Sequence, residues 1–276
     1  DNHAKLLNIS FFNDEFRETI KGGSGDFVLV NKGFITGNLY ETEHAKNVIS
    51  GLNRYSRPDQ SINYVECHDN ATVFDKLYIS NVEEGLKGIL NRQKNLTIMT
   101  LLSQGIPFIH AGQEFYRTKD RIYNSYNSPD TINSLNWDFR DIYKDDIDDI
   151  KKIIKLRKDN ECFRYDTREK IEKNVLVENI DYKMLKYTLK QDSGEYKEFK
   201  IYINPSNFTF DYQEKDYQSG MERFLEEARI LAKLQNTPNI VSVQNYFREN
   251  NTAYFVMEYV NGTSLKAYLA AHGEKI

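Results

Sequence analysis

The first 160 residues alternate short apolar runs with longer segments in which apolar residues recur at helical spacing. Such alternation is typical of β/α units, which build α/β folds around a parallel sheet. The runs that predict strands cover residues 6–12, 62–67 and 106–112. The segments that predict helices cover residues 13–22, 82–104 and 143–158. We therefore expect an α/β domain over residues 1–160, and the inner face of its last helix is expected to consist of Ile147, Ile150, Ile154 and Leu156.

Residues 161–212 have a different pattern, in which apolar and polar residues alternate over three shorter runs. These runs, at 173–179, 183–191 and 198–205, predict β-strands. Gly194 lies in the connection between the last two runs, where a glycine favours a hairpin turn. We therefore expect a small antiparallel β module over this region.

Residues 213–276 predict a third domain of mixed α and β elements. Two strands are expected at 239–249 and 252–260, followed by a short helix at 263–273. No Pro-rich or Gly/Ser-rich linker separates this domain from the β module. A helix is expected first, over residues 221–235, with one apolar stripe formed by Met221, Phe224, Leu225, Ala228, Leu231 and Leu234.

Composition argues against two classes of partner. The formal net charge of −4 argues against nucleic-acid binding as the main activity. No apolar run approaches the ~20 residues that a membrane-spanning helix needs, so no membrane partner is expected. Cys67 and Cys162 are too few for a disulfide framework and are expected to be reduced thiols. We therefore expect a cytoplasmic protein, and secretion stays open.

The strand predicted at residues 62–67 runs directly into three polar residues, His68, Asp69 and Asn70. In a β/α barrel the loops after the carboxyl ends of the strands build the active site, so an acidic residue there is well placed for catalysis. His68 and Asn70 can hydrogen-bond a hydroxylated ligand. Asp and Asn also favour turns and helix caps, so the pattern alone allows an ordinary turn as well.

Four motifs resemble one known family in the same order along the chain. Together they are similar to the second half of the catalytic barrel of type I pullulanases, which are debranching enzymes of the α-amylase superfamily (glycoside hydrolase family 13). The resemblance covers about residues 1–210. It implies a partial (β/α)8 barrel, strands six to eight with their helices, followed by a C-terminal β domain. The motifs are ISFFNDEFRETIKG at 9–22, INYVECHDNATVFDKL at 62–77, LLSQGIPFIHAGQEFYRTK at 101–119 and YNSYNSPDTINSLNW at 123–137.

The resemblance implies a role for each of five residues. In that family HDN closes the seventh strand and its Asp is the third catalytic carboxylate, so Asp69 would stabilise the oxocarbenium-like transition state. His68 would hydrogen-bond the sugar at the cleavage site, with Asn70 beside it. The YNSYNSPD loop would contribute Asn127 and Asp130 to glucan subsites. The implied partner is an α-glucan with branch points, as in pullulan, starch or glycogen. No cofactor is implied, and no clustered ligand set indicates a metal site.

The expected catalytic set is incomplete. A retaining glycosidase needs a nucleophile and an acid/base carboxylate about 5 Å apart. In family order both lie upstream of the motif at 9–22, and Asp14, Glu15 and Asp26 match neither. We therefore expect a fragment of an α-1,6-glucan debranching enzyme that hydrolyses no pullulan alone. A partial barrel would also expose strand edges and apolar faces, which favours aggregation or incomplete order.

The tail, about residues 215–276, resembles an unrelated family. The run at 223–269 is similar to part of the N-terminal lobe of bacterial serine/threonine protein kinases, with the C helix, strands four and five, and the hinge. This implies a partial, kinase-like α+β lobe. Without the resemblance, Glu227 is equally well explained as an ordinary helix-surface residue. The implied nucleotide-binding residues are Glu227 of the C helix, the gatekeeper Met257, and the hinge residues Glu258, Tyr259 and Val260.

Kinase activity is not expected. Phosphoryl transfer needs a Gly-rich loop, a strand lysine and the catalytic-loop and metal-binding residues, and none occurs in register. ATP would bind the tail only if a missing lobe completed it. Because two unrelated partial domains meet near residues 210–214, we hypothesise that the chain is a chimaera. Three functions stay open: a debranching-enzyme fragment, a noncatalytic glucan-binding protein and a kinase-like signalling module.

Overall fold

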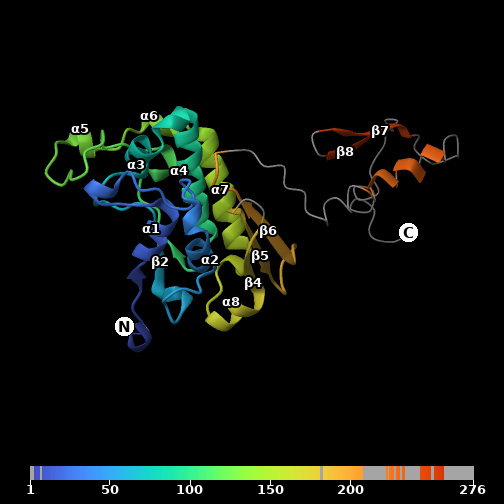
Figure 1. Cartoon of the computed structure of the whole chain (residues 1–276), viewed down its shortest axis with the longest axis horizontal. Coiled ribbons are helices and arrows are strands. Elements are labelled where there is room, and N and C mark those ends of the chain that lie inside the picture. Colours follow the sequence, from blue (N-terminus) through green and yellow to red (C-terminus); the bar gives the residue numbers. More distant parts are fainter. Residues whose placement is uncertain are drawn as a thin grey trace, which may run out of the picture. The chain divides into compact units, whose positions relative to one another are not determined.

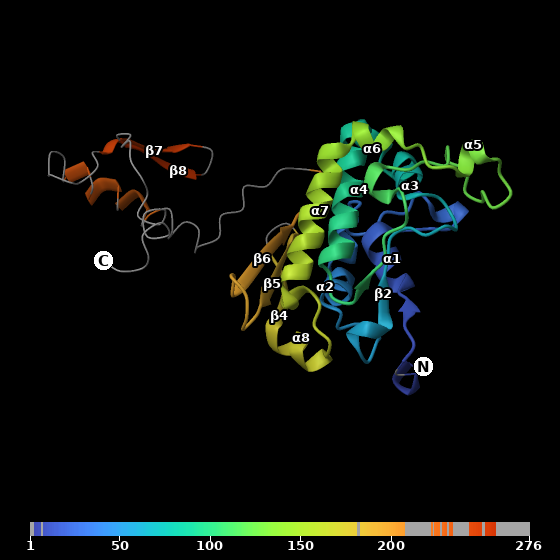
Figure 2. The same cartoon turned by 180° about the vertical axis from the view of Figure 1, so that it is seen from behind.

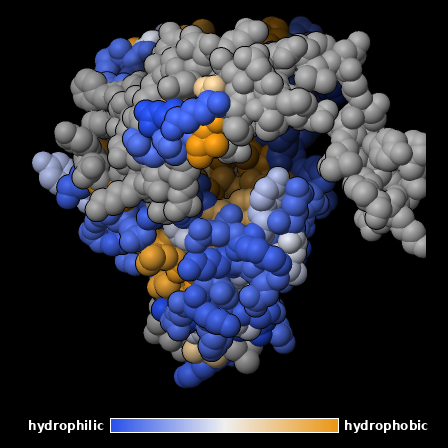
Figure 3. Space-filling view, turned by 90° about the vertical axis from the view of Figure 1, so that its right-hand side faces the viewer, coloured by the Kyte–Doolittle hydropathy of each residue, from blue (hydrophilic) through white to orange (hydrophobic). Residues whose placement is uncertain are grey.

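The computed structural model of the protein forms two compact units, residues 1–209 and 210–276 (Figure 1). No described helix combines the length and the apolar character that crossing a membrane requires. Where Figure 3 is coloured, the face that it shows is mostly hydrophilic, with smaller hydrophobic areas. The structure describes residues 3–6, 8–180, 183–207, 222, 224–226, 228–230, 232–233, 243–249 and 252–257.

The first unit contains a parallel sheet in the order β1-β2-β3. Its strands are β1 (Phe11–Phe12), β2 (Ser61–Asn63) and β3 (Ile106–Pro107). The three strands were predicted in the right places, but the ladder is much shorter than the apolar runs suggested. Helix α1 (Asp14–Lys21) begins two residues after β1 ends, and among the described strands β1 and β3 each pair only with β2.

Helices follow the strands, as the β/α alternation predicted. Helix α1 (Asp14–Lys21) begins directly after β1, where the Asn13 side chain accepts the N–H of Phe16. Helices α3 and α4 lie between β2 and β3 in the chain, and α4 packs along α7 (Figures 1 and 2). The other α-helices of this unit are α2 (Thr42–Ser50), α3 (Val73–Ser80), α4 (Gly85–Leu102), α5 (Asp130–Asn133), α6 (Asp138–Ile142), α7 (Lys144–Asp159) and α8 (Arg168–Asn174).

Helix α7 has the predicted amphipathic character with one error in phase. Ile150 is buried, and Leu156 packs against the core, as expected. The prediction for Ile154 is wrong, because its side chain is 39% exposed. Ile153 packs on the core instead. Ile150, Ile153 and Leu156 follow one another at intervals of three residues and so share one face. Ile154 is turned by about 100° around the helix axis from Ile153, which directs it away from that face.

The antiparallel module has longer strands than the parallel sheet, and its strands follow the predicted alternation of apolar and polar residues. Strands β4 (Val175–Asn179), β5 (Leu185–Lys190) and β6 (Glu198–Ile203) pair antiparallel in that order. Alternate residues of β4 are buried, and Leu185 and Tyr187 of β5 are fully buried. The module therefore lays one face on the core.

One apolar core joins helices α1 to α4 to the antiparallel sheet of the first unit. The Tyr187 hydroxyl lies inside it, donates to the carbonyl of Leu102 at 3.2 Å and accepts from Gln104 Nε2 at 3.3 Å. These bonds satisfy a buried hydroxyl and tie β5 to the end of α4. The fully buried members of the core include Phe16, Ile20, Ile49, Leu96, Phe163, Ile171 and Tyr187.

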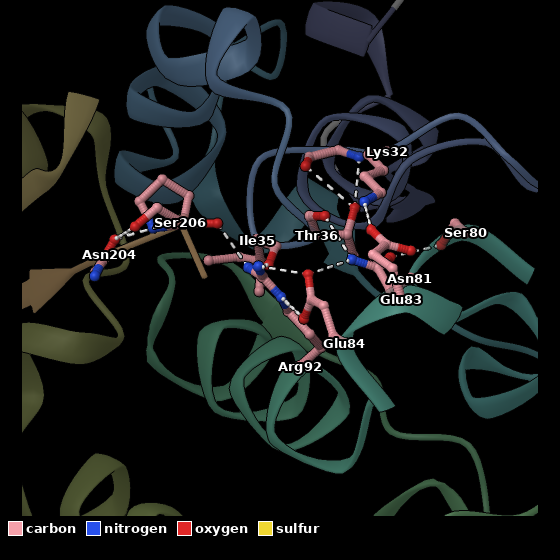
Figure 4. A network of polar contacts seen from close by, with 12 residues as sticks. Lys32, Ile35, Thr36, Ser80, Asn81, Glu83, Glu84, Arg92, Asn204 and Ser206 are labelled. Carbon is pink, nitrogen blue, oxygen red and sulfur yellow. Dashed lines mark hydrogen bonds and ion pairs between the residues drawn. The ribbon is translucent and has the colours of Figure 1, made fainter. Parts of the chain in front are cut away.

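A second tie joins the end of the β module to the helices. Arg92 of α4 donates to the carbonyls of Ile35 (2.7 Å) and Pro205 (2.6 Å). Its guanidinium also makes two bonds of 2.9 Å to the Glu84 carboxylate, and the pair is about nine-tenths buried. Figure 4 shows Arg92 between Glu84, Ile35 and the segment that carries Ser206. Because both charges are paired and hydrogen-bonded, their burial is tolerated.

In the second unit, the structure describes a two-stranded antiparallel ladder and helical residues. Strands β7 (Val243–Glu249) and β8 (Thr252–Met257) lie within the two predicted strands. Residues 222, 224–226, 228–230 and 232–233 are helical, inside the predicted helix. Met257 ends β8. Four predicted nucleotide-binding residues lie outside the described residues, namely Glu227, Glu258, Tyr259 and Val260.

Candidate functional site

The turn at His68 and Asp69 follows β2 through a buried extension. Val65 and Glu66 are buried, with relative exposures of 0% and 2%. The side chains of His68 and Asp69 are 84% and 70% exposed, and His68 Nδ1 lies 3.3 Å from Asp69 Oδ1. The chain therefore carries Asp69 from a rigid interior segment directly to solvent.

The turn is not a helix cap. The cap of α3 is Thr72, whose side chain accepts the backbone N–H of Asp75. Asn70 has a φ of 63°, a left-handed conformation that asparagine adopts more readily than most residues. The helix-cap interpretation of Asp69 and Asn70 is therefore wrong. The two residues form a turn, and a turn at this position is compatible with an active-site role.

A cavity of about 370 Å³ lies beside this turn. Among the described residues that line it, Asp69 carries the only carboxylate. Amide, hydroxyl and cationic side chains supply the other polar groups, which suits a ligand with many hydroxyls. The lining residues are His68, Asp69, Asn70, Arg117, Lys119, Asn124, Ser125, Tyr126 and Asn133.

The YNSYNSPD loop contributes to the cavity through other residues than those predicted. Asn127 is exposed and Asp130 begins α5, and neither lines the cavity. The lining residues of this loop are Asn124, Ser125 and Tyr126, of which Tyr126 is 83% exposed, and Asn133 of α5 lines the cavity as well. The resemblance indicated this loop, but the sequence carried no signal for which of its side chains turn toward the cavity.

Arg117, which lines the cavity, is connected to a buried histidine–glutamate pair. His110, which follows β3, has Nδ1 2.7 Å from the Glu66 carboxylate, and that side chain is fully buried. Its Nε2 lies 3.4 Å from Arg117 Nη1, and Arg117 Nη2 donates to the carbonyl of Asn133 at 2.6 Å. This geometry favours the tautomer with the proton on Nδ1, because Nε2 then accepts from Arg117. Sequence reasoning missed Glu66, His110 and Arg117.

Lys119 links the loop after β3 to the Asp69 turn. Its ammonium donates to the carbonyl of His68 at 2.7 Å, although the residue is only 3% exposed. Burial, together with the nearby Arg117 charge, lowers the pKa of Lys119. In the described part of the chain, no three His, Cys, Asp or Glu residues come together closely enough to hold a metal ion.

Known proteins match the two units separately. A pullulanase of Bacillus subtilis (strain 168) is 37% identical over 209 residues, which are 73% of this chain and 29% of that protein. The crystal structure of a pullulanase from Anoxybacillus sp. LM18-11 complexed with maltotetraose superposes with a TM-score of 0.68 at 39% identity, over 71% of this chain and 29% of that one. This chain thus spans less than a third of the length of either relative.

The tail matches a different family. The family model described as protein kinase domain covers residues 209–275. The serine/threonine-protein kinase PrkC of Bacillus subtilis is 43% identical over 61 residues, which are 21% of this chain and 9% of that protein.

The first unit is a mixed α/β structure with a parallel and an antiparallel sheet and a polar cavity at the end of the central parallel strand. This fold and the 37% identity define the larger part of the chain as a pullulanase-like fragment, similar to glycoside hydrolases. The tail is protein kinase-like in sequence.

Proposed function

We propose that the first unit is part of an α-1,6-glucan debranching glycoside hydrolase and holds α-glucan in the cavity beside Asp69. The observation that carries this proposal is the exposed Asp69 carboxylate at the end of the β2 segment, with hydroxyl-binding side chains around it. The maltotetraose complex of the Anoxybacillus pullulanase supports an α-glucan as ligand. In this role Asp69 stabilises positive charge at the transition state, and His68 binds a sugar hydroxyl.

We propose that this chain alone is inactive. Retaining hydrolysis needs two further carboxylates, a nucleophile and an acid/base, about 5 Å apart across the scissile bond. The described cavity lining offers Asp69 only. The Asp14 carboxylate accepts a hydrogen bond from the Tyr64 hydroxyl at 2.5 Å and does not line the cavity. Purified chain is expected to release no reducing sugar from pullulan, and any release above that of a heat-inactivated sample contradicts this.

Affinity electrophoresis tests the binding half of the proposal. In native gels containing pullulan, the chain is expected to migrate more slowly than in gels without it. D69N removes the negative charge but keeps the shape, and should weaken the retardation by up to about tenfold in apparent affinity. D26N is the matched control, because Asp26 is exposed and outside the cavity. Unchanged migration of the unmodified chain in pullulan would overturn the proposal.

A noncatalytic glucan-binding protein is the second candidate, because the same cavity serves it without any chemistry. The two candidates differ when the missing carboxylates are supplied. Co-expression with the upstream part of the Bacillus subtilis pullulanase should produce pullulan hydrolysis if this unit is an enzyme part, and D69N in the same pair should abolish it. A chain that binds pullulan but yields no activity in any such pair is a binding protein.

For the tail, we propose a kinase-like segment that binds ATP only when a further lobe completes it. The match of residues 209–275 to the protein kinase domain supports this. The nucleotide test is a thermal shift measurement of the chain with and without ATP. No shift is expected for the 276 residues alone, and a saturable shift would favour the signalling function instead.

A further inference from the structure

The backbone on both sides of Asp69 is held by one buried ammonium. Lys119 Nζ donates to the His68 carbonyl at 2.7 Å and lies 3.4 Å from the Asn70 carbonyl. Lys119 is 3% exposed, and its ammonium donates to these carbonyl oxygens. The Asp69 carboxylate pairs with its neighbour His68 at the exposed turn. The direction of its carboxylate therefore depends on how the backbone of the turn is held.

Lys119 is in turn held by Asp75 in the first turn of α3. Asp75 Oδ2 accepts the backbone N–H of Lys119 at 2.8 Å, and Oδ1 accepts the Thr118 hydroxyl at 2.5 Å. Asp75 is 1% exposed, so its charge is satisfied inside the protein by these bonds and by the Thr72 hydroxyl at 2.8 Å.

The backbone after Lys119 gives a further sign that this segment is held in place. Asp120 and Arg121 have φ values of 52° and 65°. Left-handed conformations of non-glycine residues are unfavourable and persist where the surroundings impose them. The bonds to Asp75 directly precede these two residues, so the surroundings that impose the conformation include α3.

We propose that Lys119 is a positioning residue, anchored by Asp75, that fixes the Asp69 carboxylate toward the glucan; this rests on the proposed function. The contacts form a closed circuit. The Asp69 turn is followed in the chain by α3, Asp75 of α3 accepts hydrogen bonds from Thr118 and Lys119, and the Lys119 ammonium donates to the His68 carbonyl in the turn. Loss of one link leaves the carboxylate in the protein but free to take several directions.

The test compares K119M with K119R, and K151M serves as the control because Lys151 is exposed and distant in sequence. Backbone amide resonances of Asp69 and Asn70 are measured by NMR without ligand, and maltotetraose affinity is measured by titration. K119M should shift or broaden both resonances and weaken the affinity about tenfold, the value expected for losing a hydrogen bond from a charged group. K119R should restore most of both, because a guanidinium can also donate to two carbonyls.

The outcomes separate this inference from the proposed function. Unchanged Asp69 and Asn70 resonances in K119M would overturn the positioning role even if the chain binds glucan. Shifted resonances in a chain that never binds maltotetraose would sustain the positioning role and overturn the glucan function. If K119M does not fold, T118V removes the hydroxyl that donates to Asp75 and accepts the backbone N–H of Asp120 but keeps the Lys119 ammonium, and the same two resonances should still shift, though less. Unmoved resonances there would overturn the inference.

Discussion

The two sheets of the first unit differ in the length of their strands and in how much of their apolar surface is buried. The antiparallel sheet has strands of five or six residues, and its central strand buries Leu185, Tyr187 and Leu189 completely. The parallel sheet has strands of two or three residues and leaves apolar side chains in solvent. Across its register, Phe12 pairs with Ile62 and Ile62 with Ile106, and Phe12 and Ile106 are 51% and 40% exposed.

Within this unit, the antiparallel sheet contributes mainly to the core, and the parallel sheet leads to the candidate site. The antiparallel module is closed on a core and carries none of the candidate site residues. The parallel sheet carries Asp69 and its cavity and exposes an apolar row. The candidate site lies on loops that follow the parallel strands, whereas the antiparallel strands supply side chains to the core.

The largest loss of stability is expected at Arg157, whose side chain bonds backbone carbonyls in both regions. Arg157 of α7 donates to the carbonyls of Leu101, Ser103, Gly105 and Phe163. R157M should lower the free energy of unfolding by on the order of 4 kcal/mol, about 1 for each carbonyl left without a donor. Chemical denaturation followed by circular dichroism measures this.

The controls for Arg157 are R157K and K158M. Lysine keeps a cation but cannot span four carbonyls, so it should recover less than half of the loss. Lys158 is exposed, and its replacement should change stability by less than about 0.5 kcal/mol. An R157M protein as stable as the unmodified chain would show that the two regions do not depend on this link.

A core truncation in the antiparallel module tests whether that module supports the whole unit. Leu185 is 0% exposed, and L185A should cost about 2 to 5 kcal/mol through lost burial and the cavity left behind. L176A in the neighbouring strand is the matched control, because Leu176 is 53% exposed. Equal stabilities of the two variants in urea denaturation would contradict the closed core.

Between pH 7 and pH 9, a pH effect on stability is expected from two buried lysines in the parallel-sheet region. Burial lowers the pKa of Lys76 to about 7 and that of Lys21 to about 8. Lys76 Nζ donates to the carbonyls of Leu29 and Asn31, which a neutral amine can also do. Unfolded lysine titrates near 10.4, so the unfolded chain binds more protons above pH 7 and stability rises with pH, by up to about 1 kcal/mol per unit for each group.

The measurement is the free energy of unfolding between pH 7 and pH 9. Above this range the buried hydroxyl of Tyr187, whose pKa is raised by burial, opposes the trend. K76M should flatten the slope, whereas K158M in the exposed part of α7 should not. A slope that is the same in K76M and in the unmodified chain would show that Lys76 titrates as it does in water.

The smallest effect on stability is expected at the exposed apolar row. F12S should change the free energy of unfolding by less than about 1 kcal/mol, since the ring is half exposed and contacts mainly Tyr64 and Phe108. It should nevertheless reduce aggregation in light scattering, because it interrupts an exposed apolar surface. L176S serves as the control in the antiparallel module, and equal reductions in both variants would remove the distinction between the sheets.

Much of the local structure could be predicted from the sequence. The helical spacing of α4 and α7, the alternation in β4 to β6 and the position of the His68–Asn70 turn are all properties of neighbouring residues. The motif order also indicated the pullulanase-like and kinase-like parts, which the comparisons confirmed. Strand lengths and the inward residues of the loop at 124–133 could not be predicted, because they depend on partners elsewhere in the chain.

The sequence by itself determined which residues form helices, strands and the exposed turn, because periodicity, caps and turn residues act over a few positions. Only the tertiary structure decided what surrounds Asp69. Lys119 reaches the His68 carbonyl across 51 residues of sequence, and His110 reaches Glu66 across 44. A buried lysine or histidine looks like any surface residue in a sequence, because its role comes from carbonyl and carboxylate partners that folding alone brings within hydrogen-bond distance.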